Sequence, residues 1–347
     1  MKVKETFERI CKKFGIKVEE FGFGFPPRLF GIKKGETIYS INWIPFGGFV
    51  KILGEDGDER ENPRSFGAKP ISAKLKVIVA GVTMNFLFAI FLLILGNFFG
   101  LRIGLFDEEL ANQARDKKVQ IIQVVLESPA EKAGLSILDE IVGFLYKGQE
   151  IRISTTEEVQ EFTSQHRGEN ITLLIQKGTE IFPREVQTRA NPPPGEGSMG
   201  IVMALTGVVS YPWYESIWRG AYDGAILTYH TVYGYWLLLA TLFVDGKLIG
   251  EVSGPIGIAG ITGQAARVGF SYLMQFVALI SINLAVLNIM PFPALDGGRA
   301  VFILAEKIRG KAADKRIEAL VNSLGFALLL ALMIYVTVKD ILKFFVV

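Results

Sequence analysis

Residues 288–299 read Asn-Ile-Met-Pro-Phe-Pro-Ala-Leu-Asp-Gly-Gly-Arg, and their first eight residues close an apolar run, Val268–Leu295, of 28 residues without a formal charge. A helix needs about 20 such residues to cross a bilayer core of about 30 Å. Asp296 follows this run directly, where an acid is costly unless it pairs or binds a cation. Pro291 and Pro293 break the helix just before it, and broken backbone at membrane depth must be buried in protein or line a wet cavity. The stretch therefore predicts a membrane helix that ends at a polar cavity, although an interfacial aspartate paired to Arg299 is an equal alternative.

Three further runs lack formal charges: Val77–Leu101 has 25 residues, Gly224–Val244 has 21 and Leu320–Val338 has 19. A charge at mid-membrane costs about 2.5–3.5 kcal/mol, so such runs indicate membrane segments rather than buried helices of a soluble protein. The net charge of +2 gives no indication of a nucleic-acid partner. The single cysteine, Cys11, excludes an internal disulfide.

Basic residues flank two of the runs. Segments 51–76 and 299–316 each carry six lysines and arginines, and the positive-inside rule places both in the cytoplasm. The run 77–101 then leads outward and 268–295 leads back, which requires that 224–244 does not cross completely. We therefore expect residues 216–250 at, or only partly in, the outer membrane face, with a complete fourth span as the alternative.

The remaining segments complete the domain plan. Alternation predicts a strand at 37–44, with 46–53 as its partner or a second strand, and a helix is expected at 155–166. The plan is an amphipathic helix at 1–20, a β-hairpin and charged cytoplasmic loop at 21–75, a membrane helix at 76–101, a water-facing domain at 104–196, outer-face helices at 197–265, a membrane helix at 266–298, a basic cytoplasmic loop at 299–318 and a last membrane helix at 319–340.

The pattern Asn-x-x-Pro-x-Pro-x-Leu-Asp-Gly-Gly at 288–298 resembles the hallmark of site-2-type intramembrane zinc metalloproteases. Stretches 14–30, 39–55, 80–89, 126–141 and 253–259 resemble other parts of the same family, and the resemblance covers roughly residues 12 to 340. It implies a multi-pass α-helical membrane protein with a membrane-associated β-hairpin and an inserted extramembrane PDZ-like α+β domain.

The resemblance also implies a function. The family cuts the membrane helices of anchored regulators such as anti-sigma factors, as well as remnant signal peptides, and it suggests the bacterial inner membrane with the PDZ-like domain outside. Asp296 would be the third zinc ligand, and the residues supporting the site would be Asn288, Pro291, Pro293, Gly297 and Asn85. The PDZ-like domain would bind peptide ends by strand addition, at residues that the sequence does not identify. Leu138 stands where such domains usually have a glycine, which leaves the local turn geometry open.

One departure concerns the chemistry. In the family, two histidines and a glutamate of a His-Glu-x-x-His motif on the first membrane helix bind zinc and act as general base. By alignment these positions hold Val3, Phe7 and Lys4, which have none of the required groups. The chain has only two histidines: His166 is expected at the surface of the water-facing domain, and His230 as a structural or interfacial residue of the outer-face segment.

Two functions therefore stay open. An enzyme of this family would need His-Glu-x-x-His from a longer N-terminus or a second polypeptide, because Cys11 and Asp296 alone do not make a three-ligand zinc site. The chain as written is expected to be inactive and not to bind zinc. The alternative is a non-catalytic pseudoprotease whose membrane scaffold and PDZ-like domain bind helices or peptides. A PDZ protein unrelated to proteolysis is disfavoured by the intact Leu-Asp-Gly.

Overall fold

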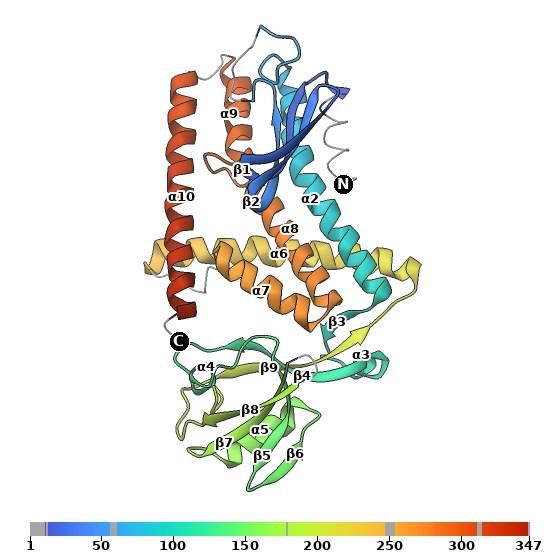
Figure 1. Ribbon diagram of the computed structural model, residues 1–347, viewed down its shortest axis with the longest axis vertical. Coiled ribbons are helices and arrows are strands. Elements are labelled where there is room, and N and C mark those ends of the chain that lie inside the picture. The colour runs from blue at the N-terminus through green and yellow to red at the C-terminus, as the bar shows by residue number, and fades with distance from the viewer. Residues whose placement is uncertain are drawn as a thin grey trace. The chain divides into compact units, whose positions relative to one another are not determined.

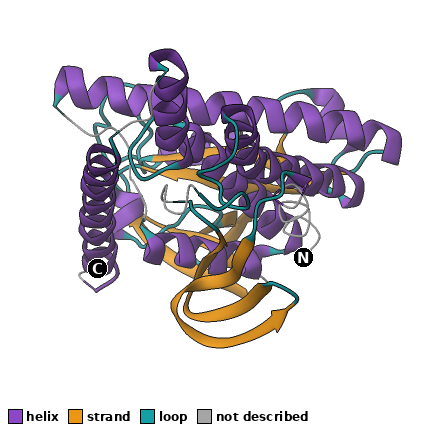
Figure 2. Ribbon diagram, turned by 90° about the horizontal axis from the view of Figure 1, so that it is seen from above, coloured by secondary structure: helices purple, strands orange, loops and turns teal. Residues whose placement is uncertain are grey.

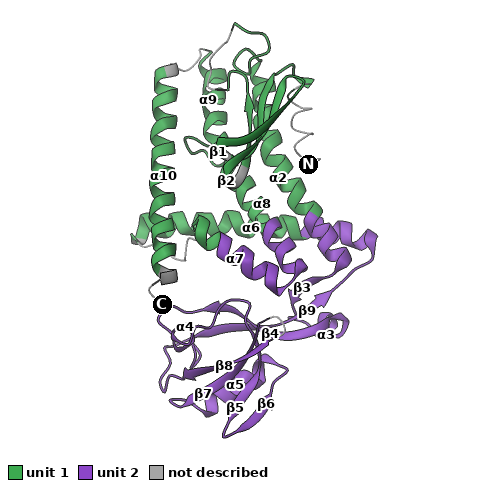
Figure 3. Cartoon of the chain, in the orientation of Figure 1, with its two compact units in different colours: residues 1–91, 223–258, 278–347 green, residues 92–222, 259–277 purple. Residues whose placement is uncertain are grey.

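The computed structural model describes residues 11, 13–55, 61–177, 180–246, 254–310 and 314–345 (Figure 1). The chain divides into two compact units, each discontinuous in sequence (Figure 3). The first consists of residues 1–91, 223–258 and 278–347, and the second of residues 92–222 and 259–277. The predicted amphipathic helix at 1–20 lies largely outside the described residues, and its last residues already belong to a strand that begins at Val18.

Four helices in the described part of the chain are long and apolar enough to cross a membrane. They are α2 (Ile71–Phe99), residues 213–244 of α6 (Trp213–Asp245), α8 (Phe270–Ile289) and residues 316–342 of α10 (Lys315–Phe345). About a third of the apolar window of α8 is buried (33%), against 6–17% for the other three. The other three helices therefore expose most of their apolar side chains, as lipid-facing helices do. Figure 2 distinguishes these long helices from the strands.

The helix α6 is unbroken over 33 residues and extends beyond both ends of the apolar run 224–244. By length and composition it qualifies as a span, while the expectation that residues 216–250 stay at the outer face remains a prediction. Within the first unit, the Tyr235 hydroxyl donates a hydrogen bond of 2.9 Å to Asn283 Oδ1. This bond ties α6 to α8.

The carboxylate of Asp340 in α10 binds the start of the helix α7 (Pro255–Val268). Asp340 Oδ2 accepts hydrogen bonds from the backbone N–H groups of Gly254 at 2.9 Å and Gly257 at 2.8 Å. The first N–H groups of a helix lack partners within the helix, and the helix dipole favours negative charge there. Asp340 therefore stabilises the start of α7 from a position far along the chain.

Two long strands, β1 (Val18–Lys34) and β2 (Thr37–Ile52), pair antiparallel in the first unit. The sequence predicted separate strands at 37–44 and 46–53, but β2 continues through both segments. The pair also folds on itself, so that Phe21 lies opposite Val50 on one side and Tyr39 on the other. Gly22 permits this close packing, because a Cβ there would stand 2.3 Å from the ring of Phe49.

The second unit contains a seven-stranded sheet with the order β3-β9-β4-β5-β7-β8, in which β6 pairs with β5. Every pairing is antiparallel. The strands are β3 (Leu101–Gly104), β4 (Arg115–Val124), β5 (Glu140–Tyr146), β6 (Gln149–Arg152), β7 (Asn170–Lys177), β8 (Glu180–Gln187) and β9 (Ile201–Val209), and the short helices are α3 (Glu108–Gln113), α4 (Pro129–Lys132) and α5 (Thr156–Gln165).

Alternating apolar residues build the core of this sheet. Ile171, Leu173 and Ile175 of β7 are each at most 1% exposed, and they pack with buried residues of β4, β5, β8 and α5. The predicted helix at 155–166 is confirmed as α5. Thr155 and Glu158 form a reciprocal capping box at its start, which satisfies backbone N–H groups that the helix leaves unpaired.

The predicted boundary of this domain at residue 196 is too early. Residues 201–209 were placed among outer-face helices, but they form β9, which pairs with β4 on one side and β3 on the other. The proline-rich segment before β9 only turns the chain, with the Glu196 N–H donating to Pro193 O. Backbone groups of β4 need a partner strand, and β9 supplies it.

Candidate functional site

The end of α8 and the start of α9 (Asp296–Arg309) form the candidate site. The helix α8 ends at Ile289, and a turn follows in which the Phe292 N–H donates to Met290 O at 2.7 Å and the Leu295 N–H donates to Phe292 O at 3.2 Å. The predicted membrane helix 266–298 is therefore wrong at its end, because Asp296 lies in the first turn of a new helix. The predicted basic loop 299–318 is also wrong over its first half, which is helical up to Arg309.

Two glycines allow α9 to begin against the carbonyl groups at the end of α8. A Cβ at Gly297 would lie 2.1 Å from Met290 O, and one at Gly298 would lie 2.2 Å from Phe292 O. Real Cβ atoms do not approach oxygen so closely, so neither position has room for a side chain. The predicted supporting residue Gly297 thus sets the position of the helix that carries Asp296.

Ala294 adopts a left-handed backbone conformation, with φ of 72°. This region costs a residue with a Cβ roughly 1 kcal/mol or more, so the surrounding structure has to enforce it. The Ala294 N–H donates to Asn322 Oδ1 of α10 at 3.3 Å, and Gly325 of α10 lies so close that a Cβ there would stand 2.5 Å from Pro293. Sequence reasoning missed Asn322 and Gly325, because their only signal is a polar residue and a glycine inside an apolar helix.

Ion pairs with segments distant in sequence also hold α9. Arg299 pairs with Glu55, which follows β2, and both charges lie near enough to act on the half-buried carboxyl group of Asp296. Lys74 of α2, only 8% exposed, lies 4.0 Å from Glu306. Sequence reasoning missed Glu55, since nothing local marks it as a neighbour of the motif.

The other predicted residues are placed as follows. Asn288 is half-buried in the last turn of α8, and Pro291 is exposed. Asn85 lies within α2, and among the described residues no hydrogen bond joins it to segment 288–298. Cys11 is fully buried in an apolar cluster, where it packs with residues such as Ile16.

The rings of both histidines contact a neighbouring aromatic ring. His166 ends α5 and stacks on Phe162, with ring centroids 4.3 Å apart, and its Nδ1 lies 2.8 Å from Phe162 O. The prediction of a simple surface position is therefore wrong, because aromatic packing half-buries the ring. His230 is exposed on α6, with its ring 5.5 Å from that of Tyr229.

The donor set at Asp296 does not fit a zinc site. Within the described ranges, no three histidine, cysteine, aspartate or glutamate side chains gather in a way that could hold a metal ion. A zinc site requires three or four protein ligands, commonly with histidine among them. The described residues around Asp296 do not supply that number of ligands, and no catalytic step through zinc follows from them.

Comparison with known proteins bears on the motif and its surroundings together. The model of Peptidase family M50 matches residues 9–332. The chain belongs to peptidase family M50. This is the site-2 protease family, so the resemblance seen in the sequence is confirmed. With four helices in its described part that are capable of spanning, this M50 chain is an integral membrane protein.

Relatives of the M50 chain align along almost its whole length. A predicted zinc metalloprotease of Clostridium perfringens is 37% identical over 96% of the chain and 92% of the relative. The zinc metalloprotease RasP of Geobacillus kaustophilus is 29% identical over 97% of the chain and 93% of the relative. The regulator of sigma-W protease RasP of Bacillus subtilis is 26% identical, with 97% and 94% covered.

Proposed function

We propose that this polypeptide is part of an intramembrane zinc-dependent endopeptidase that cleaves membrane-anchored regulators, with Asp296 as one zinc ligand. The junction of α8 and α9 carries the proposal, because the strained Ala294 and the crowded Gly297 hold Asp296 in one place. Backbone strain persists only where the structure enforces it, and it concentrates at functional sites. The name of the Bacillus subtilis relative, a regulator of sigma-W protease, supports a regulator as substrate.

In this proposal the given polypeptide has no catalytic activity by itself. A zinc peptidase needs further metal ligands and a general base, and the printed sequence contains no His-Glu-x-x-His. The catalytic form therefore requires these groups from sequence beyond the printed chain or from a second polypeptide.

A non-catalytic role in peptide binding is the second candidate, and one observation favours it. The strand β9 pairs with β4 from Ile201 onward, whereas β3 reaches only residues 206–209 on the other side. In the described sheet, residues 201–204 thus have a strand on one side only. An extended peptide added at that edge would bind as in PDZ domains, which supports the interpretation of this unit as PDZ-like.

The folded hairpin of β1 and β2 supports contact with the bilayer. Large apolar side chains are normally buried, and a contiguous exposed patch indicates an interaction surface. Six such side chains on these strands are 52–65% exposed: Phe23, Leu29, Phe30, Ile32, Ile41 and Trp43. We therefore interpret the pair as a membrane-associated β-hairpin.

A graft tests the enzymatic proposal. An apolar membrane helix that carries a His-Glu-x-x-His motif in register is fused ahead of residue 9, where the family match begins. In detergent, the fusion should bind about one zinc ion per chain and cleave a single-span model substrate. The ungrafted chain should do neither, and Asp296→Ala in the graft should lose both activities.

Two controls make the result specific. In the first, both histidines of the graft are changed to alanine, so that the effect of zinc ligation is distinguished from the effect of an added apolar helix. In the second, Asp314→Ala removes a carboxylate that lies outside the motif. Cleavage by the histidine-free graft would contradict the proposal. Zinc binding that is unaffected by Asp296→Ala would contradict the assignment of Asp296, and a zinc-loaded graft without cleavage would favour the non-catalytic role.

A further inference from the structure

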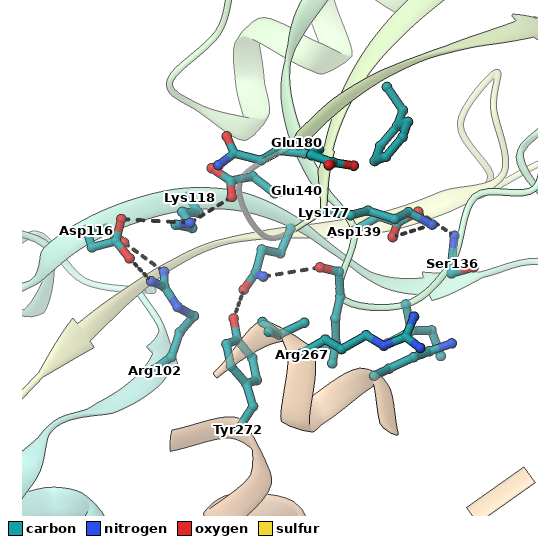
Figure 4. A pocket seen from close by; sticks show the side chains of 17 residues that line it. Arg102, Asp116, Lys118, Ser136, Asp139, Glu140, Lys177, Glu180, Arg267 and Tyr272 are labelled. Carbon is teal, nitrogen blue, oxygen red and sulfur yellow. Dashed lines mark hydrogen bonds and ion pairs between the residues drawn. The ribbon is translucent and has the colours of Figure 1, made fainter. Parts of the chain in front are cut away.

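A cavity of about 460 Å³ lies entirely within the second unit (Figure 4). Its walls come from β3, β4, the turn before β5, the last residues of β7, the first residues of β8, and the junction of α7 and α8. Binding sites for small ligands usually measure about 300–1,000 Å³, so a few peptide residues fit. No residue of the Leu-Asp-Gly motif lines it.

The charged groups of the lining balance one another. Four basic and four acidic side chains face the cavity, so its formal charge is zero and it has no net attraction for ions of one sign. Figure 4 marks the ion pairs between the lining residues with dashed lines. The pairs within the lining are Arg102–Asp116, Lys118–Asp116, Lys118–Glu140 at 2.8 Å and Lys177–Asp139 at 3.1 Å.

Two opposite charges remain available to a ligand. Arg267 near the end of α7 and Glu180 at the start of β8 are exposed, and neither makes an ion pair with another described residue. A guanidinium group and a carboxylate in one cavity suit a ligand that carries both signs, because charge-assisted hydrogen bonds are the stronger ones. The amide group of Gln264, which is exposed in the lining, matches the donors and acceptors of a peptide backbone.

Two lining residues have strained backbones. Leu138 has φ of 73° and Asp116 has φ of 50°. A bulky residue such as leucine rarely adopts positive φ, and such strain clusters at functional sites and ligand clamps. The Leu138 carbonyl accepts from Gln120 Nε2 at 3.4 Å, and Gln120 Oε1 in turn accepts from the hydroxyl of Tyr272 in α8. The strained turn is thus fixed against the start of a candidate membrane helix.

We propose that this cavity binds a short, extended peptide segment of mixed charge, the water-exposed residues next to a membrane helix of a partner protein. The position supports this partner, because Tyr272 lies two residues after Phe270, where the span α8 begins. If a helix of the partner enters the bilayer beside α8, the residues that flank this helix lie at the same depth as the cavity. The identity of the partner as a proteolytic substrate rests on the proposed function, whereas the binding itself does not.

Fluorescence anisotropy with the detergent-solubilised full chain tests the proposal. The probe is a fluorescein-labelled peptide of about eight residues in which lysine, glutamate and serine alternate, with both ends blocked so that no chain terminus can bind. Peptides of the same length with only lysine or only glutamate are the comparisons, at about 50 mM salt to limit screening. The mixed peptide should bind at least about tenfold more tightly than either one.

Charge reversals locate the site. Arg267→Glu and Glu180→Lys should each weaken binding of the mixed peptide about fivefold or more, while Arg184→Glu, on the exposed outer part of β8, is the matched control and should not change it. Equal binding of the three peptides, or full binding by both variants, would overturn the inference. Complete displacement of the peptide by phosphatidylethanolamine vesicles would also overturn the inference, because a lipid headgroup would then be the ligand. None of these readouts requires proteolysis, so a failed graft experiment leaves this test intact.

Discussion

At the scale of single residues, both the candidate site and the cavity of the second unit depend on positions where the backbone has no space for a side chain or adopts a strained conformation. Gly297 and Gly298 lie against carbonyl oxygens, and Ala294 and Leu138 have positive φ. Tight packing makes such positions sensitive to one added atom. Their substitution therefore has effects that helix propensity alone does not predict.

Gly297→Ala should lower the stability of the chain by about 1–3 kcal/mol, because the new Cβ would stand 2.1 Å from Met290 O. The melting temperature in detergent measures this change. Gly263→Ala in α7 is the matched control, since its Cβ would meet nothing within 4 Å and alanine favours a helix by about 0.5–1 kcal/mol. A Gly297→Ala chain as stable as the control would contradict the close approach.

Leu138→Gly should leave stability unchanged or raise it by up to about 1 kcal/mol, because glycine adopts a φ of 73° without steric cost. Leu138→Val should lower it by about 1 kcal/mol or more, because β-branched residues are the least tolerant of positive φ. Thermal unfolding of both variants gives the comparison. If Leu138→Val were the more stable of the two, the turn would not have this conformation.

At the scale of elements, partners distant in sequence hold α9 in place. Glu55 follows β2 and Arg299 belongs to α9, and their side chains are 30% and 27% exposed. Partly buried ion pairs couple more strongly than exposed ones, whose contribution is about 0–1 kcal/mol. This pair therefore links the hairpin segment to the helix that begins with Asp296.

A double-mutant cycle with Glu55→Gln and Arg299→Gln should give a coupling energy of about 1–2 kcal/mol in thermal unfolding. The control cycle uses Glu36 and Arg64, which also form an ion pair but are 57% and 51% exposed, and it should give about 0.5 kcal/mol or less. Equal coupling in both cycles would mean that burial does not strengthen the Glu55–Arg299 pair.

At the scale of the whole molecule, the topology depends on which of the four candidate membrane helices in the described part of the chain cross the bilayer. Charge counts place segments 51–76 and 299–316 on the cytoplasmic side, and this leaves α6 at the outer face. The helix itself is long and apolar enough to span. The positions of its two ends relative to the bilayer distinguish the alternatives.

Cysteine accessibility in whole cells decides the topology. In a Cys11→Ser background, single cysteines replace Lys69, Glu150, Tyr214 and Gly246, and a membrane-impermeant maleimide reports which of them face outward. We expect labelling at 150, 214 and 246 and protection at 69. Labelling at 214 with protection at 246 would show that α6 crosses, and labelling at 69 would overturn the charge-based orientation.

The sequence by itself determined the class of the protein and the location of its motif. Uninterrupted apolar runs mark membrane helices because a charge in the bilayer is costly, and two prolines before Asp296 mark the end of α8 because proline cannot continue a helix. The helix expected at 155–166 likewise corresponds to α5. These features depend on residues that are adjacent in the chain, so the sequence alone predicts them. The family match confirmed the resemblance that rested on them.

Only the tertiary structure decided which distant groups meet. Glu55 reaches Arg299, Asn322 reaches Ala294 and Asp340 caps α7, each across many residues. The strand β9 joins the sheet next to β4, although the sequence before it suggested that the domain had ended. Such contacts are selected by the packing of whole elements and by backbone groups that need partners, and neither leaves a periodic pattern in the chain.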